Sequence, residues 1–407
     1  MNSNTLKWIW LTSMSGMNSA KITSLLNVFD GIEEIYCASA DDFKNIDLIK
    51  ESDIKQLVNK STATAERILK KLEKIGAYVI DYESGEYPNR LKRLADPPYV
   101  LYVRGKLPDF NNKCVSIGVV GTRRYSEYGE QVTKKMCFEL ARSGFIVISG
   151  MARGIDTFAS ISALRAGSET VVVLGCGVDV VYPPENVELM NEIIRNGAVI
   201  SEYPPMSQPL GFHFPERNRI IAALSDCLLV TEAPKGSGAL ITARRAYEMN
   251  VNIFAVPGSV FAHNSVGTNN MIKAGIKSAT SPKDIIDEYT IELSQVGEHK
   301  SKAPVIVNEH RINEQQNIKS GKINKTKDYD YNKEHTIKEK RKTDLSHLSE
   351  QERLIVKIIE ENGKISCDEL IRKSDIDTAQ VNQILPLMEI MGIIKKLPGN
   401  HYIMLTE

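Results

Sequence analysis

The sequence lacks any hydrophobic run long enough to cross a bilayer. Its longest apolar runs, residues 171–175 and 227–230 among them, are far shorter than the roughly 20 residues that a transmembrane helix needs. The amino terminus is apolar only around residues 6–11, and it has neither a basic segment nor a small-residue cleavage site. We therefore expect a cytoplasmic protein with no membrane span and no signal peptide.

Cysteine and histidine are few and scattered. The six cysteines form no CxxC pair, and the seven histidines form neither an HExxH nor an HxH motif. Several cysteines lie within apolar stretches, where a reduced thiol behaves as a small hydrophobic group. This pattern excludes a disulfide scaffold and a zinc site, and it favours a reducing compartment.

The chain also has no excess charge of either sign. Its 51 lysines and arginines balance 51 aspartates and glutamates, so a site for a polyanion has to be local. A length of 407 residues with 42% hydrophobic content is typical of a globular protein of two or three domains.

Residues 1–75 predict a small helical domain, because their apolar positions recur at helical spacing. Residues 15–18 have two interpretations. They resemble a degenerate helix-hairpin-helix that grips backbone phosphates, in a domain of SAM or helix-hairpin-helix type. We favour a plain helical bundle, because Asn18 replaces the second glycine of the hairpin.

Residues 76–292 predict an α/β domain. Six runs rich in β-branched residues alternate with amphipathic segments of ten to twenty residues: 115–120, 145–149, 170–174, 198–201, 227–231 and 252–256. Uninterrupted apolar strands that alternate with helices are typical of a parallel sheet covered on both faces.

Residues 293–345 are polar, rich in lysine and poor in large apolar side chains. Such a segment cannot bury enough surface to offset the cost of ordering, so it predicts a flexible linker. We interpret it as a plain tether, and contact of its lysines with a phosphate backbone is the alternative.

Residues 346–407 predict a winged helix. Ser349 and Glu352 form a capping-box pattern, two further helices are expected at 365–373 and 377–391, and residues 392–405 fit a two-stranded wing. The exposed start of the last helix has no arginine or lysine, so we do not expect it to read base edges. Pro386 should kink or break that helix.

Glycine-containing loops follow the predicted strands of the α/β domain, at residues 121–124, 149–154, 175–177, 232–238 and 257–259. In a parallel sheet these loops meet at one edge, where backbone N–H groups and helix amino termini face an anion. Cations from the same loops and from a neighbouring one join them: Arg123, Arg153, Lys235, Arg217 and Arg219. The sequence therefore predicts a site for a phosphate-bearing ligand.

That ligand is not expected to be a nucleotide cofactor. No GxGxxG motif follows the first strand, and the second strand has no acid after it for a ribose hydroxyl. Lys235 precedes its glycines, whereas the lysine of a Walker A loop follows them. We predict no cofactor and no metal.

The chain resembles the DNA-processing protein A family (DprA, also called Smf) over residues 80–290. The resemblance rests on Tyr87-Pro88 with Leu91 and on the runs 97–105 (PPYVLYVRG), 119–123 (VVGTR), 149–156 (SGMARGID), 182–186 (YPPEN), 201–205 (SEYPP), 214–221 (FPERNRII) and 231–243 (TEAPKGSGALITA). The flanking helical and winged-helix domains also resemble that family's layout. The long basic linker is a departure from it.

The resemblance implies an extended Rossmann-like parallel sheet and a protein that is not an enzyme. Such a protein binds single-stranded DNA without sequence preference, protects it, and helps load a RecA-type recombinase during natural transformation or DNA uptake. It also implies contact with single-strand-binding protein and a homodimer formed by the Rossmann-like domain.

The candidate DNA-binding residues follow from the edge loops. We expect Arg123 and Lys235 to hold phosphates, and Gly121, Thr122, Ser237 and Gly238 to donate hydrogen bonds, with Arg153, Arg217, Asn218 and Arg219 beside them. Of the aromatic residues near this edge, we expect Phe214 and Phe261 in the core.

An enzyme is the alternative. The sheet also resembles nucleoside-monophosphate phosphoribohydrolases that activate cytokinins, whose PGGxGTxxE motif carries a catalytic glutamate. Ile241 stands at the place of that glutamate, so the positive charge of N-glycoside cleavage would lack its carboxylate. Glu202 and Glu232 are the other candidate acids, and we expect them to pair with Arg217 or Arg219.

Overall fold

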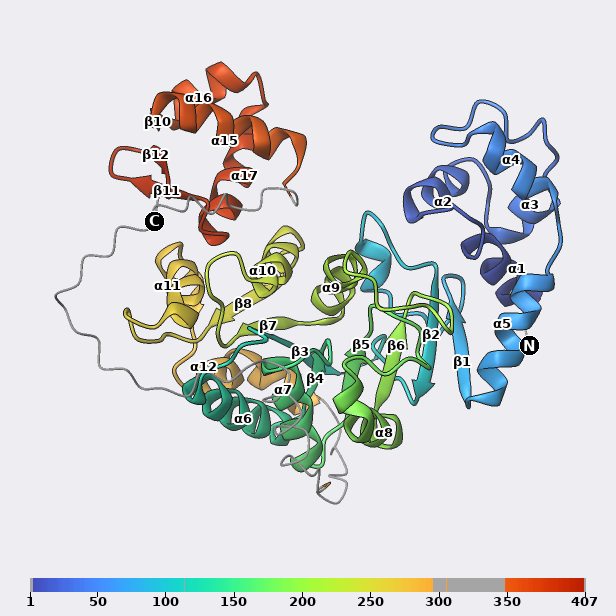
Figure 1. The fold of residues 1–407 in the computed structure, drawn as a ribbon, viewed down its shortest axis with the longest axis horizontal. Coiled ribbons are helices and arrows are strands. Elements are labelled where there is room, and N and C mark those ends of the chain that lie inside the picture. The colour runs from blue at the N-terminus through green and yellow to red at the C-terminus, as the bar shows by residue number, and fades with distance from the viewer. Residues whose placement is uncertain (1–2, 113, 296–304, 306–347, 406–407) are drawn as a thin grey trace.

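The computed structural model describes residues 3–112, 114–295, 305 and 348–405. A helical domain, a central α/β domain and a winged helix follow one another along the chain (Figure 1). Most of the predicted linker, residues 296–304 and 306–345, lies outside the described residues. Its first three residues end helix α13 (Thr290–Gln295).

The helical domain contains five helices that enclose a core around Trp8. They are α1 (Ser3–Thr12), α2 (Ser19–Leu26), α3 (Ile32–Cys37), α4 (Glu51–Val58) and α5 (Ala63–Lys74). Asn18 caps α2, because its side chain accepts a hydrogen bond from the Lys21 amide at 3.0 Å. The residue that departs from the hairpin pattern is thus a helix cap.

The central sheet has nine strands in the order β1-β2-β6-β5-β4-β3-β7-β8-β9. Their bounds are β1 (Ala77–Asp81), β2 (Val100–Gly105), β3 (Val115–Val120), β4 (Phe145–Ser149), β5 (Thr170–Val173), β6 (Ala198–Ser201), β7 (Cys227–Val230), β8 (Asn252–Ala255) and β9 (Lys277–Ser278). All six predicted strands are present to within one residue. The parallel order of β3 to β9 confirms the expected α/β class.

Two strands that were not predicted, β1 and β2, extend the parallel sheet at one edge. β1 pairs with β2, and β2 with β6, in antiparallel register. Antiparallel neighbours need no crossover helix, so these strands are not marked by the strand–helix alternation that revealed the others.

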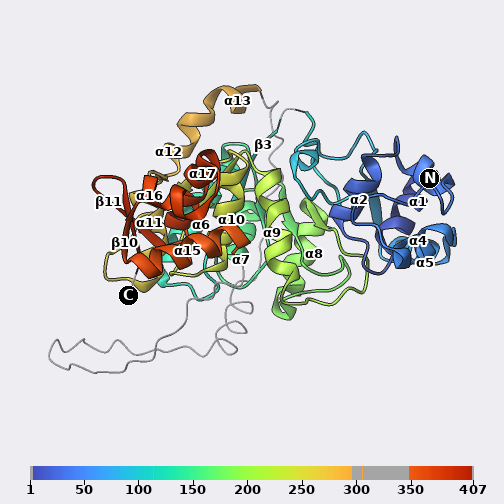
Figure 2. The same cartoon turned by 90° about the horizontal axis from the view of Figure 1, so that it is seen from above.

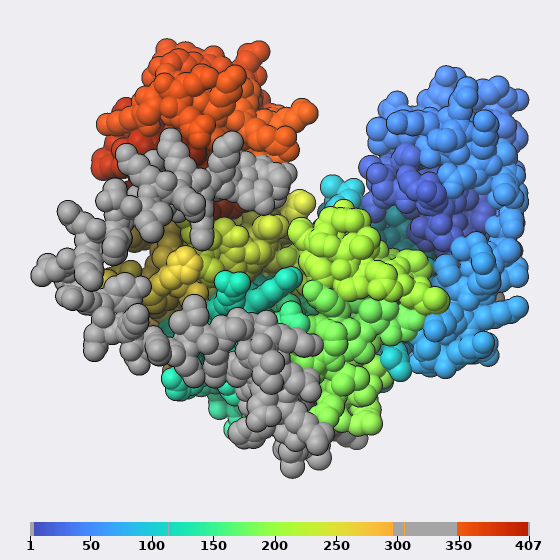
Figure 3. All heavy atoms as spheres, viewed as in Figure 1, coloured from blue at the N-terminus to red at the C-terminus, as the bar shows by residue number. Residues whose placement is uncertain are grey.

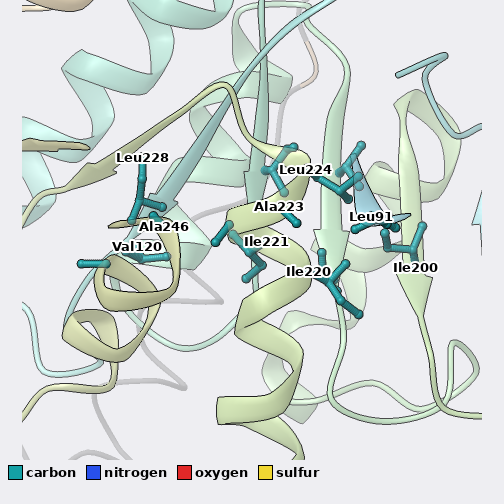
Figure 4. Packing of buried hydrophobic residues seen from close by; sticks show 14 of the residues in the cluster. Leu91, Val120, Ile200, Ile220, Ile221, Ala223, Leu224, Leu228 and Ala246 are labelled. Atoms are coloured by element: carbon teal, nitrogen blue, oxygen red, sulfur yellow. The ribbon is translucent and has the colours of Figure 1, made fainter. Parts of the chain in front are cut away.

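Helices cover both faces of the sheet. The bounds are α6 (Glu127–Arg142), α7 (Ile155–Arg165), α8 (Val187–Asn196), α9 (His213–Leu224), α10 (Gly238–Glu248), α11 (Val266–Lys273) and α12 (Lys283–Ile286), with 3-10 turns η1 (Leu91–Arg93), η2 (Pro184–Asn186), η3 (His263–Ser265) and η4 (Asp287–Tyr289). Successive residues of β3 point to opposite faces: Val119 packs with α6 and α7, and Val120 with α9 and α10. Figure 4 shows Ile220, Ile221 and Leu224 of α9 in the second of these layers.

The winged helix consists of α15 (Glu350–Asn362), β10 (Lys364–Ser366), α16 (Cys367–Ser374), α17 (Thr378–Ile390), β11 (Ile394–Leu397) and β12 (His401–Met404). The capping box of Ser349 and Glu352 is formed as predicted. Helix α17 continues through Pro386, so the predicted break does not occur. Leu385, Leu387 and Met388 are buried around the proline, and their packing favours the continuous helix.

The winged helix packs against α10 and α11 of the central domain (Figure 1, Figure 2). Ile390 joins the core layer that contains α9 and α10. Arg244 of α10 forms an ion pair of 2.8 Å with Glu352, whose side chain is only 1% exposed. In Figure 3 the winged helix and the helical domain project on either side of the central domain.

Candidate nucleic-acid interface

A groove of about 720 Å³ lies at the carboxyl edge of the sheet. Loops after β3, β4 and β7 form it together with the first turns of α9 and α10, as the parallel strand order requires. Seven of the ten candidate residues line this groove: Gly121, Thr122, Arg123, Arg217, Asn218, Ser237 and Gly238. The other three candidates do not.

Arg123 and Arg124 are the exposed cations of the groove. Neither forms an ion pair with any residue in the described ranges. The Arg123 guanidinium lies 5.4 Å from the centre of the Phe214 ring. The loop that carries both arginines is fixed, because the Thr122 amide donates to the Glu232 carbonyl at 2.8 Å and the Thr122 hydroxyl accepts from the Arg124 amide at 3.1 Å. This pair is available to phosphates.

Gly121 permits the β3 loop to pass close to α7. A Cβ atom at this position would lie 2.5 Å from the Ile155 side chain, closer than two carbon atoms can approach. A larger residue would push the Arg123 loop away from the sheet. Glycine is therefore needed here for close packing, in addition to any contact that its amide makes.

The amino terminus of α10 faces the groove from the β7 side. The Ser237 hydroxyl caps this helix by accepting from the Ala239 amide at 3.3 Å, and Ser237 and Gly238 both line the groove. The first turn of a helix leaves N–H groups without intrahelical partners, and these groups favour an anion. Ile241 of the same helix also lines the groove.

Arg217 lines the groove but is buried by its own contacts. Its guanidinium donates to the Gly150 carbonyl at 2.8 Å and to the Val173 carbonyl, which joins the ends of β4 and β5. Burial lowers the pKa of this guanidinium to about 10, so it stays charged at neutral pH. Asp156 adds an opposite charge beside it. Arg217 thus holds the edge together.

Arg153 and Arg219 are engaged outside the groove. Arg153 forms a two-point ion pair with the buried Glu185, with one N–O distance of 3.2 Å. Arg219 pairs with Glu202 at 2.6 Å and with Asp96 at 3.0 Å, beside the helical domain. Each would have to leave a carboxylate to bind a phosphate, so this geometry does not support their predicted role.

Lys235 points to the winged helix. Its ammonium donates to the Leu405 carbonyl at 3.1 Å, and the residue is not among those that line the groove. Nothing in the loop sequence indicates this contact, because its partner lies 170 positions along the chain. The role of Lys235 in phosphate binding stays a prediction.

The candidate acids are held by other groups. Glu202 pairs with Arg219 as expected, whereas Glu232 accepts from the Ser126 amide at 3.0 Å and from the Asn264 side chain at 3.3 Å. Asp156 is the only acid that lines the groove in the described part of the chain, and it accepts from the Gly150 amide at 3.1 Å. Burial raises the pKa of the Asp156 carboxyl, and the Arg217 charge opposes this shift.

The aromatic residues differ from the sequence-based expectation. Phe214 is half-buried and lines the groove with Tyr182, whose ring centre is 5.3 Å away. Phe261 was expected in the core, and that was wrong: it is 88% exposed. Sequence reasoning missed Tyr182 and Arg124 as groove residues, although Tyr182 begins the run YPPEN and Arg124 lies in the glycine-containing loop 121–124.

The described residues include no group of three or more histidines, cysteines or acids placed to hold a metal ion. Within the same residues, every helix is too short or too polar to cross a membrane.

Comparison with known proteins gives a consistent match. The family model of DNA recombination-mediator protein A matches residues 78–290, and that of the DprA winged helix domain matches residues 339–400. DNA processing protein DprA of Bacillus subtilis is 36% identical over 242 residues, which cover 60% of this chain and 81% of that protein. DNA processing protein DprA of Streptococcus pneumoniae is 41% identical over 203 residues, which cover 50% of this chain and 71% of that protein.

A solved structure supports the same family assignment. The X-ray structure of DNA processing protein A from Streptococcus pneumoniae superposes with a TM-score of 0.63 at 32% identity, and it covers 70% of this chain and 98% of that chain. The matched region contains the whole groove, because every residue that lines it lies between 120 and 242. The chain belongs to the DNA recombination-mediator protein A family.

Proposed function

We propose that this protein binds single-stranded DNA in the groove at the carboxyl edge of the sheet, without sequence preference. It protects the strand and helps load a RecA-type recombinase during natural transformation or DNA uptake. The observation that carries the proposal is the exposed Arg123–Arg124 pair opposite the amino terminus of α10. Together they present charge and N–H donors to a phosphate backbone.

The groove favours a single strand over a duplex because it contains aromatic side chains. The half-buried rings of Tyr182 and Phe214 lie beside Arg123. Unpaired bases offer faces on which such rings stack, and every base has such a face, so stacking tolerates any sequence. A duplex keeps those faces within its own stack.

We propose that the protein acts as a mediator and not as an enzyme. Ile241 lines the groove at the position of the hydrolase glutamate, and an isoleucine cannot stabilise positive charge. Asp156, the acid of the groove, is engaged by backbone amides and lies near Arg217. The name of the family, DNA recombination-mediator protein A, supports the role of a mediator. We further propose that the protein is a cytoplasmic homodimer and that it contacts the recombinase and single-strand-binding protein.

The test is a salt series of binding to a random single strand and to the matched duplex. We expect tighter binding of the single strand, and the slope of log K against log salt should fall by about 0.7 in Arg123→Ala because one phosphate contact is lost. Arg142→Ala is the matched control, since Arg142 is an exposed arginine at the end of α6, before β4 begins at the opposite edge of the sheet. Equal slopes in the two variants, or a preference for duplex, would exclude the groove as the site.

A further inference from the structure

Phe261 is the most exposed large hydrophobic residue of the described chain. Its ring is 88% exposed, and the preceding Val260 is 79% exposed. An aromatic side chain contributes to folding by being buried, so a ring held in solvent contributes little to stability. Its exposed position indicates that the ring contacts another molecule.

The exposure of Phe261 is imposed by a well-anchored turn. The Ala262 amide donates to the Ser259 carbonyl at 3.0 Å, and the Phe261 amide donates to the Ser259 hydroxyl at 3.3 Å, so Phe261 lies at the tip. Below the tip, Asn269 makes two hydrogen bonds to Gly258, of 3.2 and 3.0 Å. The ring is therefore presented in a defined place.

The same loop is joined to the wall of the groove. The Asn264 side chain donates to the Arg124 carbonyl at 2.8 Å, and the Ala233 amide donates to the Asn264 carbonyl at 2.9 Å. The loop follows β8, which lies next to β7 in the sheet, so Phe261 stands one strand beyond the groove along the same edge. A strand that leaves the Arg123–Arg124 pair toward β8 reaches this loop next.

We propose that Phe261 is a stacking platform for a base of the bound single strand, just outside the groove on the β8 side. The inference rests on the proposed function. A nucleobase is the occupant favoured here because the loop adjoins the exposed arginines and residues 257–262 contain no charged side chain. Phosphates would be held by the arginines while the neutral ring receives a base.

The experiment separates base contacts from phosphate contacts. Binding of a thymidine strand of about 12 nucleotides is compared with binding of an abasic strand of the same length, for the unchanged protein, Phe261→Ala and Phe261→Trp. Phe261→Ala should bind the thymidine strand roughly tenfold more weakly and the abasic strand equally well. Phe261→Trp should restore binding.

Ile291→Ala is the matched control. Ile291 is 71% exposed on α13, and α13 follows Tyr289, whose hydroxyl contacts Asn252 and Asp226 at the starts of β8 and β7. It therefore lies toward the opposite edge and should leave both affinities unchanged.

Three results would overturn the platform. Phe261→Ala binding the thymidine strand like the unchanged protein would exclude a base contact. An equal loss on both strands would mean that the residue only positions the loop. A change in sedimentation mass without a change in DNA affinity would assign the ring to self-association. Failure of the unchanged protein to bind either strand would instead refute the proposed function itself.

Discussion

Arg123 and Arg217 both line the groove, but their surroundings give them different functions. Arg123 is exposed and can meet a ligand, whereas Arg217 is buried against the carbonyls of Gly150 and Val173. The same residue type therefore supplies a binding charge in one place and a structural clamp in another.

Arg217→Ala should destabilise the protein. The change leaves two carbonyls without their donor and removes the charge that faces Asp156, and breaking such a buried arrangement costs about 3 kcal/mol. Chemical denaturation should show a lower unfolding midpoint, while Arg123→Ala should shift stability by less than about 0.5 kcal/mol. If the two variants unfolded alike, Arg217 would not be a clamp.

The absence of a glutamate at Ile241 predicts no catalysis. We expect no release of free base from nucleoside monophosphates and no strand cleavage, with or without a divalent metal. Chromatography of the reaction mixture against a blank without protein measures this. Turnover that disappeared in Glu202→Gln, Glu232→Gln or Asp156→Asn would restore the enzyme interpretation.

At the scale of elements, α10 connects the groove to the winged helix. Its first turn lines the groove, and Arg244, six residues after Gly238 in the same helix, pairs with the buried Glu352. Loops and helix ends thus present the binding groups, while another side of the same helix contacts a second domain.

Arg244→Ala should loosen the winged helix. While the winged helix stays docked, Glu352 is buried, and leaving its charge without Arg244 costs about 3 to 5 kcal/mol. Release of the domain exposes that charge to water and avoids this cost, so the variant should favour release. Hydrogen exchange should become faster where α17 meets α11. Arg245→Ala is the control, because Arg245 pairs only with Glu248 of its own helix in the described residues. Unchanged exchange in Arg244→Ala would show that docking does not depend on the pair.

Lys235→Ala should reduce the salt slope of single-strand binding less than Arg123→Ala does. In the docked arrangement the Lys235 ammonium is bonded to the Leu405 carbonyl, whereas Arg123 is open to the groove. The measurement is the same salt series. Equal reductions in the two variants would mean that Lys235 leaves the winged helix to meet the strand.

At the scale of the whole molecule, all residues that line the groove belong to the central domain. A chain that stops after α13, at residue 295, should therefore still bind single strands with nearly the same salt slope. It should also be less stable, because Ile390 no longer covers the apolar layer that contains α10. Loss of nearly all binding by a folded fragment would move the site to the winged helix.

The sequence by itself determined the strands β3 to β8, the edge at which their loops meet, and the capping box at Ser349. These follow from local periodicity and from loop residues a few positions apart. It also placed seven of the ten candidate residues in the groove, because a parallel order forces the loops after β3, β4 and β7 together.

Only the tertiary structure decided which cations are open to a ligand. Arg153 meets Glu185 across 32 positions of sequence, Arg219 meets Glu202 across 17, and Lys235 meets Leu405 across 170. The exposure of Phe261 likewise depends on a turn anchored by Asn269. Burial and pairing depend on partners that are distant in sequence. A pattern along the chain therefore identifies charged and aromatic side chains, but it does not show whether they are exposed to a ligand.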